Sequence, residues 1–305
     1  MSARRLLALL LLAQLVGAAL AGWAIAYALQ GGWIAGLVGG AGALVLVRVA
    51  ISANNFRMSA RAGSPTPPAY RLGARAALRL FGDEFAQSMR YASWIMPRAA
   101  PCLRVHADAH LPPVLLLHGY GCNSGYWAHL VPRLDAARIS HATLDLVPLT
   151  AAIDDYVPLV EAGVQALLAA SGAARDVIVA HSMGGLVARA WLRAHGSERV
   201  ARVITLGTPH HGTRLASFGI GANAAQMRQG SAWLTALAAS ENMATRALIT
   251  SIYTHHDNIV APQTSSELDG ARNLAFGAVG HVALGANRQI LDAVLHELGS
   301  DCGAN

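Results

Sequence analysis

The first fifty residues of the chain are almost entirely apolar. No charged residue occurs between Leu6 and Val47, a stretch of 42 positions. As a helix, with a rise of about 1.5 Å per residue, this stretch would be roughly 60 Å long, twice a bilayer core of about 30 Å. A turn is therefore expected inside it, and the sequence LQGGW at 29–33 is where it falls. The pattern predicts two membrane-spanning helices, Leu6–Leu29 and Trp33–Ile51, that form a transmembrane hairpin in residues 1–51.

The basic residues around the hairpin predict its orientation. They lie before the first span and after the second, while the turn carries no charge: Arg4, Arg5, Arg48, Arg57 and Arg61. By the positive-inside rule both ends are cytoplasmic, which predicts an inner-membrane protein of a bacterium whose large domain faces the cytoplasm.

A signal peptide is the alternative interpretation of the first span. The sequence RRLLALLLLAQLVGAALA has a basic start, an apolar run and small residues at Ala19 and Ala21. Cleavage there would still leave the second span as an anchor, with the domain on the periplasmic side. Both interpretations predict attachment to a membrane.

Residues 52–111 form a connector. AGSPTPPAY at 62–70 is a Pro-rich break, and residues 71–96 have the spacing of one or two amphipathic helices. Arg71, Arg75 and Arg79 are spaced four apart and so share one helix face. That face is either exposed to solvent or in contact with anionic lipid headgroups, and the sequence leaves both open.

After Leu111 the pattern changes to short apolar runs that alternate with helical segments. This alternation predicts an α/β domain at 112–305 with a doubly wound, mostly parallel sheet. The expected strands are 113–118, 139–146, 176–181, 202–207, 248–254 and 272–278.

Composition adds two limits. The net charge of +6 is concentrated in residues 1–111, which hold 11 Arg and 3 acids, whereas residues 112–305 hold 12 Arg and 14 acids. No arginine cluster is interleaved with aromatic residues on the larger domain, so nucleic acid is not expected as a partner, and no obligate protein partner is evident. The three cysteines, Cys102, Cys122 and Cys302, fit no metal pattern; free thiols are expected, although one disulfide is compatible with the count.

One serine stands at the corner between an expected strand and an expected helix. In DVIVAHSMGGLVARAWL, at 176–192, Ser182 follows the run that ends in His181 and precedes Gly184 and Gly185. With Ala180 two positions before it and Gly184 two positions after it, the serine has the spacing of a nucleophile elbow. Small neighbours are needed there because a tight turn exposes the hydroxyl close to the adjoining elements. Taken alone, the motif is also compatible with a corner of small residues that serves only packing.

A second turn follows the first strand of the domain. The sequence HGYG at 118–121 would place the backbone N–H of Tyr120 beside the elbow, where it and the N–H of Met183 would form an oxyanion hole. Gly119 and Gly121 would allow close approach of the backbone. His118 is expected to be a structural hydrogen-bonding residue rather than a base.

The remaining catalytic groups are expected after later strands. Asp257 lies just past the strand at 248–254, and His281 follows the last strand in the sequence VGHVAL. In this order the serine would be the nucleophile, the histidine the base and the aspartate the group that orients it. Other carboxylates are rivals for the last role: Asp145, Asp154, Asp155 and Asp269.

Together, the motifs AHSMGG, HGYG, LGTPHHGT, DNIVAP and VGHVAL resemble the α/β-hydrolase superfamily and, within it, bacterial lipases. The resemblance covers residues 112–298 and is greatest to small lipases that lack a large lid. It implies hydrolysis of carboxylic esters, with lipid acyl esters as substrates, through an acyl-enzyme and without a cofactor. Larger bacterial lipases carry a calcium ligand just after the catalytic histidine; HVALGAN has no such aspartate, so no metal is expected.

Two questions stay open at this point. The segment between GTPHHGT and Leu248 is either a crossover helix packed on the sheet or a cap over an acyl pocket, or both in different parts. The same residues could also serve a thioesterase or an acyltransferase, and an inactive scaffold of this fold is a further alternative.

Overall fold

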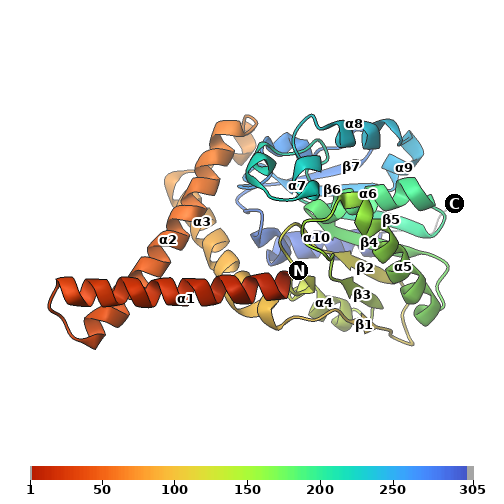
Figure 1. Ribbon diagram of the computed structural model, residues 1–305. Coiled ribbons are helices and arrows are strands. Elements are labelled where there is room, and N and C mark those ends of the chain that lie inside the picture. Colours follow the sequence, from red (N-terminus) through yellow and green to blue (C-terminus); the bar gives the residue numbers. More distant parts are fainter. Residues whose placement is uncertain (1, 301–305) are drawn as a thin grey trace.

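The computed structural model in Figure 1 describes residues 2–300, and Cys302 lies outside them. Within this range Cys102 and Cys122 are free thiols. The centre of the molecule is a seven-stranded sheet in the order β1-β3-β2-β4-β5-β6-β7, in which only β1 is antiparallel to its neighbour. The strands are β1 Leu103–Arg104, β2 Val114–Leu117, β3 His141–Leu144, β4 Asp176–His181, β5 Val200–Leu206, β6 Ile249–Thr254 and β7 Arg272–Phe276.

The structure confirms the predicted fold class and all six predicted strands. It adds β1, which the sequence pattern missed because a strand of two exposed residues shows no apolar alternation. Alternate residues of the central strands enter two separate cores: Leu115 and Ile178 on one face, Val114 and Val177 on the other.

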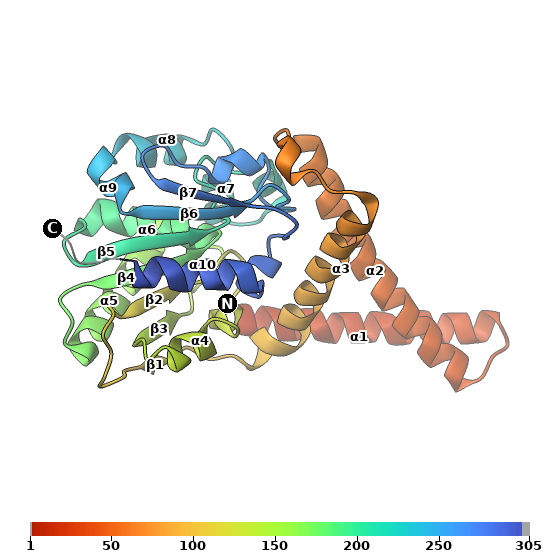
Figure 2. The same ribbon diagram turned by 180° about the vertical axis from the view of Figure 1, so that it is seen from behind.

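Helices cover both faces of this sheet, as Figures 1 and 2 show from opposite sides. The first face packs against α5 (Val157–Ser171), α6 (Met183–His195) and α8 (Ala232–Ala239) through Val160, Leu186 and Leu234. The second packs against α4 (Val131–Ala136) and α10 (Arg288–Gly299). Two short helices, α7 (Ala222–Gln226) and α9 (Met243–Ala247), complete the domain.

The two predicted apolar helices are present as α1 (Ala3–Ala28) and α2 (Trp33–Ala62), each long and apolar enough to cross a membrane. They project from the sheet domain and join at their far end (Figure 1). Glycines allow their backbones to approach closely, because a Cβ at Gly22 would lie 2.2 Å from the Gly36 carbonyl oxygen. A Cβ at Gly40 would likewise lie 2.3 Å from the carbonyl oxygen of Ala18. Small residues spaced four apart are typical of packed membrane helices.

The helix α2 continues past Ile51 to Ala62 and so leads directly to the sheet domain. Next comes α3 (Ala74–Arg90), the predicted amphipathic helix, which lies between α2 and the domain (Figure 2). Arg75 and Arg79 are exposed on α3, and Arg71 is exposed just before it.

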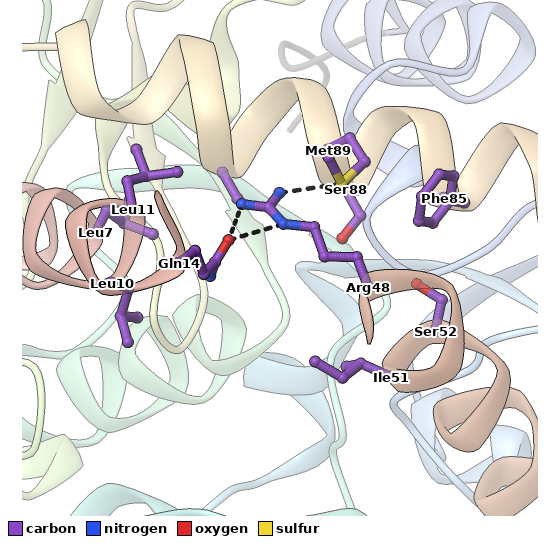
Figure 3. A pocket seen from close by; sticks show the side chains of 11 residues that line it. Leu7, Leu10, Leu11, Gln14, Arg48, Ile51, Ser52, Phe85, Ser88 and Met89 are labelled. Carbon is purple, nitrogen blue, oxygen red and sulfur yellow. Dashed lines mark hydrogen bonds between the residues drawn. The ribbon is translucent and has the colours of Figure 1, made fainter. Parts of the chain in front are cut away.

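Arg48 of α2 joins the two apolar helices to the connector (Figure 3). Its guanidinium donates to Gln14 Oε1 of α1 at 2.8 Å. It also donates to Met89 Sδ of α3 at 3.0 Å and to Ser93 Oγ, in the turn after α3, at 2.8 Å. An apolar cavity of about 180 Å³ adjoins these bonds and is lined by leucines of α1. The partly buried guanidinium of Arg48 thus links α1, α2 and α3 through three side chains.

Candidate active site

Ser182 occupies the strained corner that the sequence predicts between β4 and α6. Its φ is 53° and its ψ is −123°, a region that non-glycine residues rarely enter. Such backbone strain costs on the order of 1–3 kcal/mol and persists only where the surroundings enforce it. Here the N–H of Ser182 donates to the Leu206 carbonyl at 2.9 Å, and Thr208 Oγ1 donates to the Ser182 carbonyl at 2.9 Å.

The predicted glycines around Ser182 have no room for a side chain. A Cβ at Gly184 would lie 2.6 Å from the Leu117 carbonyl oxygen, and one at Gly185 would lie 2.1 Å from Thr208 Oγ1. A Cβ at Gly119, in the turn after β2, would lie 2.8 Å from the Cβ of Ser182. The close approach of three backbone segments therefore requires these glycines and brings the HGYG turn against the serine.

Asp257 and His281 form a buried pair at the carboxyl edge of the sheet. His281 Nδ1–H donates to Asp257 Oδ2 at 2.7 Å, and both side chains are almost fully buried. The other oxygen, Oδ1, accepts from the backbone N–H groups of Ile259 and Val260 at 2.8 and 2.7 Å. The aspartate is thus fixed on both sides, and it leaves Nε2 of His281 to act on a substrate or nucleophile.

Three of the four rival carboxylates have other partners, and the fourth, Asp269, is exposed at the surface. Asp145 accepts from the N–H of Ser124, Asp154 pairs with Arg193 and Trp233, and Asp155 accepts from the N–H of Ala152. Among the described residues, His281 forms an ion pair with Asp257 alone. This geometry favours Asp257 over its rivals.

The electrostatic surroundings of His281 favour its protonated form. Burial by itself lowers the pKa of His281, but the charge and hydrogen bond of Asp257 and the charge of Glu84 outweigh it and raise the pKa above its ordinary value. A histidine that takes up a proton from serine gains from such anionic neighbours, because they stabilise the imidazolium.

His181, the residue before Ser182, links the serine to His281. Its ring lies 4.6 Å from the ring of His281, and its Nε2–H donates to the His281 carbonyl at 3.3 Å. On the other side it stacks on Tyr126 at 3.9 Å. Burial and the neighbouring His281 lower the pKa of His181 well below its ordinary value, so it is a neutral packing group.

His118 lies at the end of β2 with both ring nitrogens in use. Its Nδ1–H donates to the Gly119 carbonyl and its Nε2 accepts from the N–H of Leu146, each at 2.9 Å. Burial lowers the pKa of His118, which keeps this tautomer neutral. These bonds shape the HGYG turn and leave no nitrogen free for catalysis.

The two expected oxyanion donors belong to two different segments, the start of α6 and the turn after β2. Met183 is the first residue of α6, where the N–H groups of a helix have no partner within the helix. Tyr120 follows Gly119, and Gly121 adopts φ +69° to complete the turn. The hydroxyl of Tyr120 donates to the Ile220 carbonyl at 2.8 Å and accepts from its N–H at 3.0 Å, which ties the turn to the segment after β5.

Three residues that were not singled out from the sequence contact the segments that carry Asp257 and His281. Ser59 of α2 donates to the Asp257 carbonyl at 2.6 Å, and Gln263 Nε2 donates to the same oxygen at 2.9 Å. The buried carboxylate of Glu84, in α3, accepts from the N–H groups of Val282 and Ala283 at 3.0 and 2.9 Å. No local motif marks Ser59 or Glu84, because their partners lie about two hundred residues away in the sequence.

A largely apolar cavity of about 270 Å³ opens beside Ser182. Its wall combines Asn55 and Met58 of α2 with residues of the segment after β5: Leu215, Ala216, Phe218, Gly219, Ala224 and Met227. Farther along the same segment, Leu234 and Leu237 of α8 pack in the core against the sheet. One part of this segment therefore packs on the sheet and another lines the cavity; that the second part caps an acyl pocket stays a prediction.

Comparisons with known proteins find sequences similar to this chain. The family model of the alpha/beta hydrolase fold matches residues 112–232. A triacylglycerol lipase of Burkholderia plantarii is 30% identical over 152 residues, which cover 44% of this chain and 42% of that protein. One of Pseudarthrobacter phenanthrenivorans is 44% identical over 55 residues, 18% of this chain and 17% of that protein. The chain thus matches less than half the length of these curated relatives.

Solved structures extend the likeness to the fold. The mature form of lipase BlEst2 from Bacillus licheniformis has a TM-score of 0.58 at 18% identity and covers 65% of this chain and 98% of its own. Lipase B of Aspergillus fumigatus has a TM-score of 0.56 at 18% identity, over 67% of this chain and 57% of its own. The part of the chain that follows the connector therefore has the α/β-hydrolase fold and resembles bacterial lipases.

Proposed function

We propose that the protein is a membrane-anchored serine hydrolase that cleaves carboxylic esters, with lipid acyl esters as the substrate class. The proposal rests on the 2.7 Å bond between His281 and Asp257 together with a strained Ser182 that lines an apolar cavity. The likeness to triacylglycerol lipases supports the same chemistry.

In the proposed mechanism, Ser182 Oγ attacks the ester carbonyl while its proton passes to Nε2 of His281. The resulting oxyanion accepts hydrogen bonds from the backbone N–H groups of Met183 and Tyr120. As the carbon–oxygen bond of the ester breaks, His281 returns the proton to the leaving alcohol and the acyl group stays on Ser182. A water molecule, deprotonated by His281, then attacks the acyl-enzyme and releases the carboxylic acid and free serine. Asp257 holds the imidazole and stabilises its charged form.

The proposal treats residues 1–51 as a transmembrane hairpin, 52–111 as a juxtamembrane connector and 112–305 as the catalytic domain. Aromatic residues at the far end of the hairpin, Trp23, Tyr27 and Trp33, are highly exposed, as expected at a membrane interface. The turn carries no charge, whereas Arg4, Arg5 and the arginines after Val47 lie at the domain end. This distribution supports a domain on the cytoplasmic face of the membrane.

The position of the cavity supports a substrate that arrives from the bilayer. Residues of α2, the second apolar helix, form one wall, and Phe218 and Ile220, next to the cavity, are each 76% exposed. Large apolar side chains that are this exposed cost free energy in water, and insertion into lipid would remove that cost. An ester in the adjacent leaflet could then reach Ser182 without crossing bulk water.

A fluorophosphonate probe tests the proposed nucleophile. The full chain in detergent micelles is expected to react at Ser182, and Ser182→Ala is expected to abolish both the label and ester hydrolysis. Ser240→Ala, which removes an exposed hydroxyl at the end of α8, is the matched control and should keep both. Failure of the wild-type chain to label would contradict the proposal.

A substrate panel then tests the ester class. Short-chain esters, phospholipid and acylglycerol vesicles, acyl-CoA and an alcohol acceptor separate ester hydrolysis from thioester hydrolysis and acyl transfer. We expect the highest kcat/KM on vesicle-bound esters. A reporter fused to the C-terminus, active only on one side of the membrane, tests the sidedness; activity on the periplasmic side would contradict the cytoplasmic assignment.

A further inference from the structure

A group of metal-ligating side chains lies on the sheet far from the proposed active site. His106 follows β1, Asp135 belongs to α4 and His141 begins β3, and one ligand atom from each lies within 4.8 Å of the others. In the strand order β1-β3-β2-β4, two strands separate β1 from β4, the strand that precedes Ser182. The proposed ester chemistry does not use these residues.

His141 has an unused ring nitrogen inside the protein. Its side chain is fully buried, and its Nδ1–H donates to the Ile139 carbonyl at 2.9 Å. That bond fixes the tautomer and directs a lone pair outward from Nε2, which has no hydrogen-bond partner among residues 2–300. Buried polar atoms without a partner are uncommon, and a histidine whose other nitrogen donates to a carbonyl is the usual arrangement of a metal ligand.

The distances suit a small tetrahedral ion. Asp135 Oδ1 lies 3.3 Å from Nε2 of His106 and 3.8 Å from Nε2 of His141. Ligands at about 2.0–2.1 Å from a tetrahedral ion are separated from one another by roughly 3.4 Å. The second oxygen of Asp135 pairs with Arg104, which would orient the carboxylate without occupying Oδ1.

Cys102, which directly precedes β1, lies beside His141 but outside this group of three ligands. β1 and β3 pair so that Arg104 lies opposite His141, and Cys102 therefore pairs with Thr143, two residues along on the same face. The half-buried Cys102 thiol accepts from Thr143 Oγ1 at 3.6 Å. Imidazole, carboxylate and thiolate are the ligand types that zinc prefers.

We propose that His106, Asp135 and His141 bind a divalent transition-metal ion, with Zn²⁺ the preferred ion, and that this ion holds β1 and the loop after it to the sheet. β1 has only two residues, and both are exposed, so the segment gains little from apolar burial. A metal–ligand link between this segment, α4 and β3 would supply the missing stabilisation. The loop after His281, on which the expectation of no metal is based, does not contribute to this site; the three ligands come together only in the fold.

The test uses the full, untagged chain in detergent, stripped with a chelator and titrated with Zn²⁺ alone. We expect one zinc per chain and an increase in Tm of several degrees, and Co²⁺ should give the absorption bands of a tetrahedral site. His141→Ala and the more exposed His106→Gln should each lower zinc affinity at least tenfold. His110→Ala, an exposed histidine four residues after His106, is the matched control and should bind as the wild type does.

Two results would overturn the proposal. One is the absence of stoichiometric zinc binding by the wild-type chain. The three side chains would then interact only through hydrogen bonds and ion pairs of the two histidines with Asp135. The other is equal affinity in His106→Gln and His110→Ala. Circular dichroism on the same samples reports whether each variant is folded, and fluorophosphonate labelling at Ser182, scored separately, keeps this outcome apart from that of the proposed esterase function.

Discussion

The hydroxyl of Ser59, in the second apolar helix, donates a 2.6 Å hydrogen bond to the backbone carbonyl of Asp257. A helix that leads out of the proposed membrane segment thus touches the residue proposed to orient the catalytic histidine. Glu84 of α3 makes the second such contact, beside His281. Helices α2 and α3 therefore contact the segments that carry two of the proposed catalytic residues.

Ser59→Ala should lower kcat/KM by about tenfold, because a buried hydrogen bond of this kind contributes on the order of 1 kcal/mol and its loss loosens the Asp257 loop. The measurement is steady-state hydrolysis of a soluble ester. Ser64→Ala, which removes a weaker 3.3 Å contact with Gln263, should remain within twofold of wild type. Equal effects of the two substitutions would show that the contact with Asp257 has no special importance.

Glu84→Gln should shift the pH profile of kcat/KM. His281 must be neutral to accept the serine proton, so activity rises as pH increases through its pKa. The negative charge of Glu84 raises the pKa of His281; the neutral amide should lower it, and the acid limb should move to lower pH. Asp83→Asn removes an exposed charge at the adjacent position and should leave the limb in place. An unchanged limb in Glu84→Gln would contradict the electrostatic role.

Asp257→Asn should lower kcat on the order of 10³–10⁴-fold and leave the fold intact, because an amide can present an N–H to Nδ1 and stabilise the wrong tautomer. Single-turnover acylation by a chromogenic ester measures the loss. Asp145→Asn, at a rival carboxylate bonded to Ser124, should lose far less activity. A larger loss of activity in Asp145→Asn than in Asp257→Asn would indicate that Asp145 orients the histidine.

Replacing both Phe218 and Ile220 by serine should change the hydrolysis of vesicle-bound esters but not that of soluble esters. Hydrolysis of a short soluble ester should stay near wild type, whereas hydrolysis of an ester in vesicles should fall about tenfold as the apolar contact with lipid is lost. Met243→Ser is the control: it is also exposed, at 65%, but lies in α9, at the end of the domain away from α1 and α2 (Figure 1). Equal losses on both substrates would indicate damage to the cavity itself.

Stability should decline as pH rises because of Asp176, at the start of β4. Burial raises the pKa of Asp176 to about 7, and its carboxylate oxygens have no partner in residues 2–300. The folded state favours the protonated acid, so this stabilisation is complete below the ordinary pKa of about 3.9 and is lost as pH rises to about 7. The free energy of unfolding should fall by roughly 2–4 kcal/mol over that range. Thermal unfolding in detergent between pH 4 and 8 measures it.

Asp176→Asn removes the titrating group and should flatten that dependence while it raises Tm above pH 7. Asp292→Asn, at an ion-paired and half-exposed carboxylate of α10, is the comparison and should keep the wild-type slope. The explanation fails if the wild-type and Asp176→Asn curves have the same slope.

Much of the fold follows from local patterns. Six apolar runs bounded by turn residues predict six strands, and a chargeless stretch too long for one span predicts a turn at LQGGW. The motif spacing also predicts which residues lie at the carboxyl edge of the sheet, because consecutive parallel strands end on the same side. The catalytic roles of Ser182, Asp257 and His281 stay predictions.

Other features could not be derived from the sequence, because they depend on contacts between distant segments. Nothing near Ser59 or Glu84 indicates that one faces the Asp257 carbonyl and the other the backbone after His281. The same holds for His106, Asp135 and His141, which three separate elements bring together. Periodicity and motif spacing are properties of neighbours in the chain and determine elements and their order. Only the tertiary structure decides which side chains share a buried space, and hence that the apolar helices and the active site form one structure.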